Sequence, residues 1–145
     1  MHANAQWEGR FRTALDDARG HRVVVDLPVE EDGADAGASA LELSVLSLAG
    51  CITTIFALVA RRRHLSVESL RVELEAVRPR GARTITRVDG TARFVTRAPP
   101  AEIATALAIT LRTCPVGVLF EQAGVPVHVE PRIVEPAAAA PASGD

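Results

Sequence analysis

Two cysteines are the residues of this sequence best suited to covalent chemistry. Cys51 lies inside the uncharged run from Leu43 to Ala60, and Cys114 stands immediately before Pro115. A thiolate is both a nucleophile and a reductant, so two cysteines that folding brings together form a redox pair. Their spacing in the sequence does not show whether they meet. The alternative for Cys51 is that of a small buried hydrophobic residue without reactivity.

The sequence around each cysteine predicts a different setting. Residues three, four and seven positions away share the helix face of Cys51, and they include Ser44, Ser47 and Thr54, which leave room beside the thiol. Proline is favoured at the first position of a helix, which predicts Cys114 at an N-cap. The positive end of the helix dipole is expected to lower the pKa of a thiol there. The alternative for Cys114 is a helix kink with an unreactive thiol.

Composition and charge narrow the possible functions. The 145 residues suit one domain, which we predict over residues 1–134, followed by a disordered tail over 135–145 that is too poor in apolar side chains to form a core. The net charge is −2 and aromatic residues make up 3%. These values argue against nucleic-acid binding, which uses a basic surface and aromatic stacking platforms. No Cys or His cluster has metal-ligand spacing, and no cofactor is indicated.

The uncharged run also raises the question of a membrane. It covers 18 residues and ends at Arg61, Arg62 and Arg63, whereas a span needs about 20 apolar residues. The flanking segments alternate like strands of a water-soluble core, so we favour a helix buried on most of its surface and no membrane. In a small domain such burial commonly requires a partner subunit. No signal-like segment opens the sequence, which predicts a cytoplasmic protein.

The elements that must position the cysteines follow from periodicity and turn residues. The sequence predicts strands over 5–14 and 21–28 joined by a turn, and a loop over 29–40. A long helix follows over about 40–64, with Ser39 and Glu42 spaced as a capping box. Strands are expected over 67–80 and 83–98, with a possible turn or bulge at Asp89-Gly90. Helices over 99–113 and 116–124 and a strand over 125–134 complete an α+β domain, in which antiparallel strands cover long helices.

Three sequence segments together resemble one known family. The segment "ASALELSVLSLAGC" (38–51), followed by "CPV" (114–116), is similar to the OsmC/Ohr family of osmotically inducible and organic hydroperoxide resistance proteins. Residues 20–37 resemble the strand and loop that precede the helix in its OsmC-like branch. The resemblance covers roughly residues 5–130. It implies an intertwined homodimer in which antiparallel sheets surround long central helices, and the reduction of organic hydroperoxides by a thiol.

The resemblance also implies roles for single residues. Cys51 would be the peroxidatic cysteine, which becomes a sulfenic acid, and Cys114 would resolve it as a disulfide. A dithiol reductant of lipoyl or thioredoxin type would then regenerate the pair. Glu42 matches the family's carboxylate, although it lies nine residues before Cys51 rather than ten. The family's arginine comes from the first strand, where Arg10 and Arg12 are expected to share one face.

A second function is consistent with the same sequence. The chain could keep the dimeric fold and an apolar pocket and act as a ligand-binding or redox-sensing module with little peroxidase turnover. That alternative predicts slow, stoichiometric oxidation of Cys51.

Overall fold

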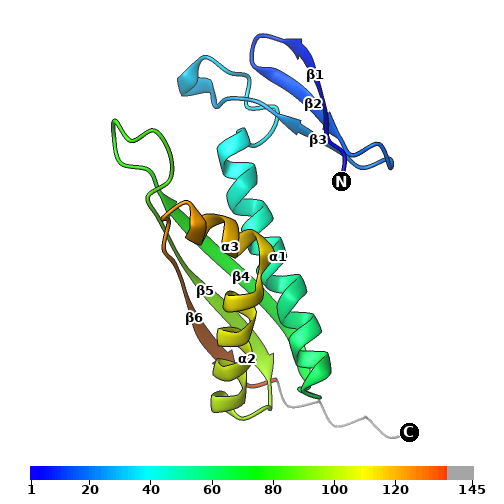
Figure 1. Cartoon of the computed structure of the whole chain (residues 1–145), viewed down its shortest axis with the longest axis vertical. Helices are drawn as coiled ribbons and strands as arrows, with labels where there is room; N and C mark the ends of the chain where they lie inside the picture. Colours follow the sequence, from blue (N-terminus) through cyan, green and yellow to red (C-terminus); the bar gives the residue numbers. More distant parts are fainter. Residues whose placement is uncertain (137–145) are drawn as a thin grey trace, which may run out of the picture. The chain divides into compact units, whose positions relative to one another are not determined.

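The computed structural model of the chain describes residues 1–136, which divide after Ser47 into two compact units (Figure 1). The N-terminal unit holds three strands and the start of the long helix. The C-terminal unit holds the rest of that helix, three further strands and two helices. Most of the predicted tail over 135–145 lies outside the described residues, and the single domain over 1–134 stays a prediction.

The N-terminal unit is built on an antiparallel sheet of β1 (Asn4–Gly9), β2 (Arg12–Asp16) and β3 (Arg22–Val25). The prediction of one strand over 5–14 is wrong, because the chain turns back at Gly9 and Arg10, where φ is +115° and +45°. Arg10 therefore lies in the turn, while Arg12 begins β2. The two arginines do not share one face of a single strand. The turn predicted before β3 is confirmed.

Asp26 organises the loop that follows β3. Its buried carboxylate accepts hydrogen bonds from the backbone N–H groups of Leu27, Ala34 and Ala36, at 2.8 to 3.2 Å. These bonds, with that from Ala36 foremost, lower the pKa of Asp26. At Gly33 any side chain would collide with the carbonyl of Leu27. The loop, which includes the short 3-10 helix η1 (Val29–Glu31), is thus folded back onto the end of β3.

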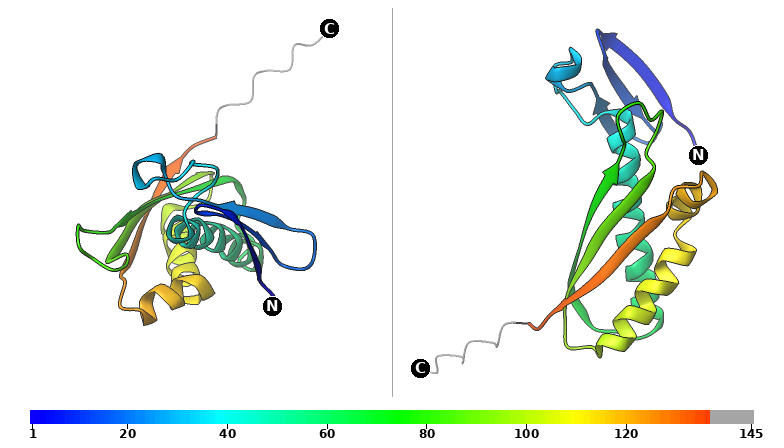
Figure 2. Two further views of the ribbon diagram at one scale, coloured as in Figure 1. Left: turned by 90° about the horizontal axis from the view of Figure 1, so that it is seen from above. Right: turned by 90° about the vertical axis from the view of Figure 1, so that its left-hand side faces the viewer.

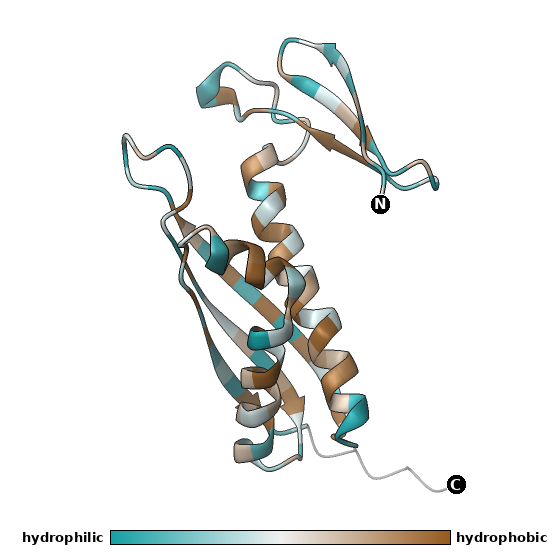
Figure 3. Cartoon of the chain, viewed as in Figure 1, coloured by the Kyte–Doolittle hydropathy of each residue, from teal (hydrophilic) through white to brown (hydrophobic). Residues whose placement is uncertain are grey.

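The long helix α1 (Ala40–Arg62) begins at the predicted capping box. The Oε2 atom of Glu42 accepts hydrogen bonds from the backbone N–H and the hydroxyl of Ser39, each at 2.7 Å, and the N–H of Glu42 donates to the Ser39 hydroxyl at 3.3 Å. Between Glu42 in its first turn and Arg61 in its last, the helix is largely hydrophobic (Figure 3). By length and composition α1 could cross a membrane, and 28% of its most apolar window is buried in this chain.

The C-terminal unit contains a second sheet, in the order β4 (Val67–Val77), β5 (Arg87–Thr96), β6 (Val127–Val134). β4 and β5 pair antiparallel, whereas β6 lies parallel to β5 after a crossover through α2 (Pro100–Thr113) and α3 (Pro115–Gln122). Within this unit the helices cover one face of the sheet (Figure 2). The predicted α+β class is confirmed.

The suggestion of a turn or bulge at Asp89-Gly90 is wrong. Gly90 lies inside β5 in regular pairing with Leu74. A side chain at this position would collide with the carbonyl of Glu73 on the neighbouring strand. Glycine at this position therefore allows β4 and β5 to approach closely, and the chain does not change direction there.

The core of the C-terminal unit fixes how α1 is rotated against the sheet. The buried residues of α1 fall at helical spacing on one stripe: Leu48, Ile52, Phe56, Val59 and Ala60. The ring of Phe56 packs against that of Phe94 from β5, with centroids 4.7 Å apart and planes tilted by 46°. Cys51 lies one residue before Ile52 on this anchored helix, so the packing of the stripe determines where its thiol points.

Candidate active site

Cys114 lies at the corner between α2 and α3, whose axes are bent by 62°. Its backbone N–H donates to the carbonyl of Thr110 at 2.8 Å and so closes α2. Its sulfur accepts the N–H of Gly117 at 3.4 Å and so caps α3. The N-cap position predicted from Pro115 is confirmed. Cys114 thus ends one helix through its backbone N–H and caps the next through its sulfur.

The fold brings the two cysteines together. Both thiols are free, and Cys51 is half-buried whereas Cys114 has no exposed surface. Burial, with the neighbouring Cys51 thiol as the second cause, raises the pKa of Cys114 to about 11, although the N–H of Gly117 acts in the opposite direction. The prediction of a lowered pKa for Cys114 is wrong, because desolvation of the thiolate outweighs the helix dipole. Cys114 therefore carries its proton at neutral pH.

This raised pKa predicts a specific loss of stability in alkali. An unfolded cysteine has a pKa of 9.0, against about 11 for Cys114 in the fold. Between these values the unfolded chain has released a proton that the folded chain keeps, so the free energy of unfolding falls as pH rises. We expect a fall of roughly 2 kcal/mol from pH 9 to 11 for the reduced protein, relative to Cys114→Ala, in urea titrations. Parallel curves for the two proteins would contradict this assignment.

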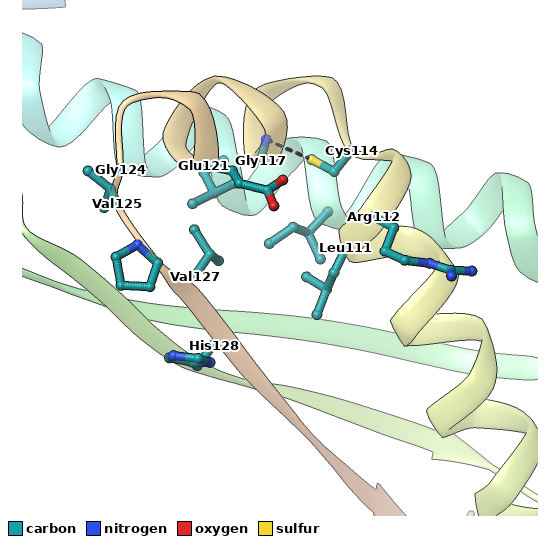
Figure 4. Close-up of a pocket in the computed structure, with 12 residues that line it drawn as sticks. Leu111, Arg112, Cys114, Gly117, Glu121, Gly124, Val125, Val127 and His128 are labelled. Atoms are coloured by element: carbon teal, nitrogen blue, oxygen red, sulfur yellow. Dashed lines mark hydrogen bonds between the residues drawn. The ribbon is translucent and has the colours of Figure 1, made fainter.

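A pocket of about 490 Å³ opens beside Cys114, within the C-terminal unit (Figure 4). Leu48 and Ile52 of α1 contribute to its wall. The other lining residues come from α2, α3 and β6 and the turn between the last two: Leu111, Arg112, Cys114, Gly117, Glu121, Gly124, Val125, Pro126, Val127 and His128. The walls are largely apolar, with three side chains that carry or can carry charge. Such a cavity suits a slender organic molecule with few polar atoms.

The charged residues of this pocket escaped the sequence analysis. Glu121 lies seven positions after Cys114 and Gly117 lies three after it, which places all three on one face of α3. Once Cys114 is placed at the N-cap of a helix, this spacing predicts that Gly117 and Glu121 lie on the same face as the thiol. Arg112 and His128 offered no such signal, because only the crossover brings α2 and β6 to the same cavity. Within residues 1–136 no group of three His, Cys, Asp or Glu side chains is arranged to hold a metal ion.

The other predicted site residues belong to the N-terminal unit, and each has a partner there. Arg10 pairs with Asp32 at 2.6 Å, and Arg12 pairs with Glu8 at 2.8 Å. Glu42 is engaged with Ser39, whose hydroxyl and N–H lower the pKa of the carboxylate. The participation of Arg10, Arg12 and Glu42 in chemistry at Cys51 stays a prediction.

One family model matches the sequence over most of its length. The family is described as OsmC-like protein, and residues 32–130, which include both cysteines, match it. No curated protein sequence matches the chain.

Several solved structures share the fold at low sequence identity. An OsmC like protein from Mycoplasma pneumoniae is 14% identical, with a TM-score of 0.81 over 92% of this chain and 96% of that chain. An organic hydroperoxide resistance protein from Elizabethkingia anophelis is 16% identical, with a TM-score of 0.73 over 91% and 94%. One from Legionella pneumophila, named OsmC, is 18% identical, with a TM-score of 0.71 over 90% and 94%. At these identities the likeness shows the fold.

Proposed function

Because the chain belongs to the OsmC-like protein family, we propose that it is a thiol-dependent peroxidase for organic hydroperoxides. The observation that carries the proposal is the contact between two free thiols in unequal surroundings, Cys51 half-buried and Cys114 fully buried with a raised pKa. This difference supports two separate roles for the thiols. The more accessible Cys51 sulfur reacts with the peroxide, and the buried Cys114, which keeps its proton, reacts afterwards with the oxidised Cys51.

The proposed reaction has two steps at the protein. Cys51 releases its proton and the thiolate attacks the outer oxygen of the hydroperoxide, so that the O–O bond breaks and Cys51 becomes a sulfenic acid, while the departing alkoxide takes up the released proton and leaves as the alcohol. The Cys114 sulfur then attacks the Cys51 sulfur, the S–O bond breaks, and the Cys114 proton leaves with the hydroxide as water. A dithiol reductant, of lipoyl or thioredoxin type, returns the disulfide to two thiols.

The first step benefits from a cation beside the departing oxygen, and we assign that role to Arg10 or Arg12, oriented by Glu42. Both arginines form exposed ion pairs, since the side chains of Arg10 and Asp32 are 65% and 78% exposed and those of Arg12 and Glu8 are 50% and 36% exposed. Exposed pairs contribute about 0–1 kcal/mol, so either guanidinium can exchange its carboxylate for a peroxide oxygen at little cost.

The peroxidase activity is tested by the rate of thiol loss from the reduced protein. We expect cumene and tert-butyl hydroperoxide to oxidise it at least 100-fold faster than they oxidise a free thiol, and faster than hydrogen peroxide does, because the apolar surroundings favour an organic group. Cys51→Ser should abolish the fast phase. Fast oxidation that survives in Cys51→Ser would contradict the assignment of the peroxidatic residue.

The apolar pocket beside Cys114 favours one alternative function, that of a ligand-binding or redox-sensing module with little turnover. The same experiment separates the two functions. A sensor would lose its thiols stoichiometrically and slowly, at a rate near that of a free thiol, and would show no preference for organic peroxides.

We further propose that the protein is cytoplasmic and that its active form is a homodimer, because α1 is more apolar than its burial in the single chain accounts for. One stripe of this helix is uncovered in the single chain: Ser47, Gly50, Thr54, Ala57 and Leu58. Small residues on such a stripe allow two helices to approach closely. In the N-terminal unit, Trp7 and Val23 lie on one face of the sheet and are 68% and 45% exposed. Apolar side chains exposed in this way are typical of a surface that a second subunit covers.

Gly50→Leu should convert the dimer to a monomer. The position has no neighbouring atom within 4 Å of an added Cβ, so leucine fits the single chain and obstructs only a second helix packed on this face. Sedimentation velocity should show at least a tenfold weaker association with an unchanged far-ultraviolet circular dichroism spectrum. Ala108→Leu, at an exposed position of α2, is the matched control. An unaltered dimer in Gly50→Leu would exclude this face of α1 as the interface.

A further inference from the structure

The two sulfurs of the proposed disulfide differ in their access to solvent. Cys114 is fully buried, although a pocket lies beside it, whereas Cys51 is half-buried and retains exposed surface. In thiol–disulfide exchange the incoming thiolate must reach the sulfur that it attacks, and the other sulfur leaves with the electron pair of the S–S bond. Access therefore favours attack on Cys51, with Cys114 as the leaving group.

Departure of Cys114 places a negative charge on a buried sulfur. Burial disfavours the thiolate and is the main reason why the pKa of Cys114 is raised to about 11 in the reduced protein. A thiol with a high pKa is a slow leaving group. Opening of the disulfide in this direction therefore requires hydrogen-bond donors at the Cys114 sulfur.

The start of α3 provides two such donors. The N–H of Gly117 donates to the Cys114 sulfur, with 3.4 Å between the nitrogen and Sγ (Figure 4). The N–H of Val116 contributes less, and both N–H groups act to lower the pKa of the thiol against the effect of burial. No acidic side chain lies in the first turn of α3, so the positive end of the helix dipole acts on the sulfur without a competing carboxylate in that turn.

The local backbone keeps these donors available to the sulfur. Pro115 has no N–H, and the N–H of Val118 donates to the carbonyl of Cys114 at 2.9 Å, as in a regular helix. Val116 and Gly117 therefore supply first-turn N–H groups that have no acceptor within the helix. Gly117 also leaves space beside the sulfur, because a Cβ at this position would lie 3.4 Å from the Cβ of Cys114 and 3.6 Å from its Sγ.

We propose that the Cys51–Cys114 disulfide opens in one direction: the incoming thiolate bonds to the Cys51 sulfur, and Cys114 departs as a thiolate stabilised by the N–H groups of Val116 and Gly117. The inference rests on the proposed disulfide. The S–S bond breaks, its electron pair leaves with Cys114, and this sulfur then takes up a proton from water. The second thiolate of a dithiol reductant attacks the reductant's own sulfur in the mixed disulfide, so that Cys51 leaves as a thiolate and the reductant becomes a disulfide.

The direction of opening is tested on the full-length chain by locating the first mixed disulfide. The Cys51–Cys114 disulfide is formed with diamide, which requires no peroxide, and verified by thiol counting. The monothiol 2-mercaptoethanol is then added, and early samples are quenched in acidic methyl methanethiosulfonate, which caps the freed cysteine. Peptic digestion and mass spectrometry locate each group, and the distribution is extrapolated to zero time. We expect 2-mercaptoethanol on Cys51 at least about tenfold more often than on Cys114, because only Cys51 is accessible.

Stabilisation of the leaving thiolate is tested by replacing Gly117. Gly117→Pro removes the N–H at a first-turn position that tolerates proline, and it should slow opening about tenfold, as expected when a charged group loses a hydrogen bond. Gly117→Ala keeps the N–H and should stay within about twofold of the unaltered protein. Ala101→Pro, at an exposed first-turn position of α2, is the matched proline control and should not change the rate. Alkylation of reduced Cys51 by iodoacetamide should be equally fast in all of these proteins.

The outcomes distinguish this inference from the proposed function. If 2-mercaptoethanol appears first on Cys114, the proposed direction is wrong, and this result is decisive even if Gly117→Pro fails to fold. Equal rates of opening in Gly117→Pro and Gly117→Ala would overturn stabilisation by the N–H. A chain that forms no Cys51–Cys114 disulfide would overturn both this inference and the proposed resolving step. Slow oxidation by peroxides, combined with attack at Cys51, would overturn the peroxidase alone and support the direction of opening.

Discussion

Cys114→Ser should retain the first oxidation of Cys51 and lose turnover. We expect the rate of the first reaction with cumene hydroperoxide to change by less than about threefold, because Cys114 takes no part in cleaving the O–O bond. Steady-state peroxide consumption with a dithiol should fall at least 100-fold, because no second thiol closes the disulfide. Serine is also a good N-cap, so its hydroxyl can accept the N–H of Gly117 and preserve the start of α3.

Two measurements check this separation. Stopped-flow kinetics give the first reaction, and mass spectrometry after trapping with dimedone gives the sulfenic acid. The trapped adduct should reside on Cys51 in Cys114→Ser and be scarce in the unaltered protein, where the disulfide forms instead. Turnover that persists in Cys114→Ser, with no trapped adduct, would show that an external thiol resolves Cys51 directly and would remove Cys114 from the mechanism.

Phe56→Ala should give the largest loss of stability of any single truncation proposed for this chain. Phe56 is 2% exposed and packs against the fully buried ring of Phe94, so truncation leaves a cavity between α1 and β5. Burial of this kind contributes about 3–5 kcal/mol on replacement of Phe by Ala. Urea titration of the reduced protein should show a loss of this size. If the variant folds, its thiols should also react less selectively, because the rotation of α1 is less fixed.

Leu119→Ala is the matched control for Phe56→Ala. Leu119 lies on α3 and is 64% exposed, so its truncation removes an apolar side chain without opening a cavity. We expect a change below about 0.5 kcal/mol. A loss for Phe56→Ala no greater than that of the control would mean that α1 is not anchored to the sheet through this pair.

The sequence predicted those parts of the fold that depend on local chemistry. Ser39 and Glu42 determine where α1 begins, and the structure confirms their capping box. Pro115 correctly predicts that Cys114 caps a helix. These features depend on residues within one turn of each other, so the sequence alone contains the information. The sequence analysis missed the hairpin between β1 and β2. Its turn places Arg10, a non-glycine residue, at positive φ, a conformation that residue preferences do not predict for arginine.

The site was only partly predictable because its electrostatics depend on packing. The N-cap position of Cys114 suggested a lowered pKa, yet burial raises it, and burial follows from how α1 and the crossover enclose the thiol. The meeting of Cys51 and Cys114 could be inferred only from the family resemblance, since no rule of spacing joins residues so far apart. Glu121 was detectable from helical periodicity only after Cys114 had been placed.

The parallel pairing of β5 and β6 has a consequence for the newly made chain. Parallel strands cannot be joined by a tight hairpin, so β6 reaches β5 only after the intervening α2–α3 segment has formed. During synthesis Cys51 leaves the ribosome long before Cys114, and until the crossover folds, an oxidised Cys51 lacks Cys114, the thiol that we propose resolves it. Such chains are exposed to irreversible oxidation to the sulfinic acid. If Cys51 and Cys114 act as proposed, newly made chains should be more sensitive to peroxide than mature ones, and variants that slow the folding of the crossover should lower the yield of active protein.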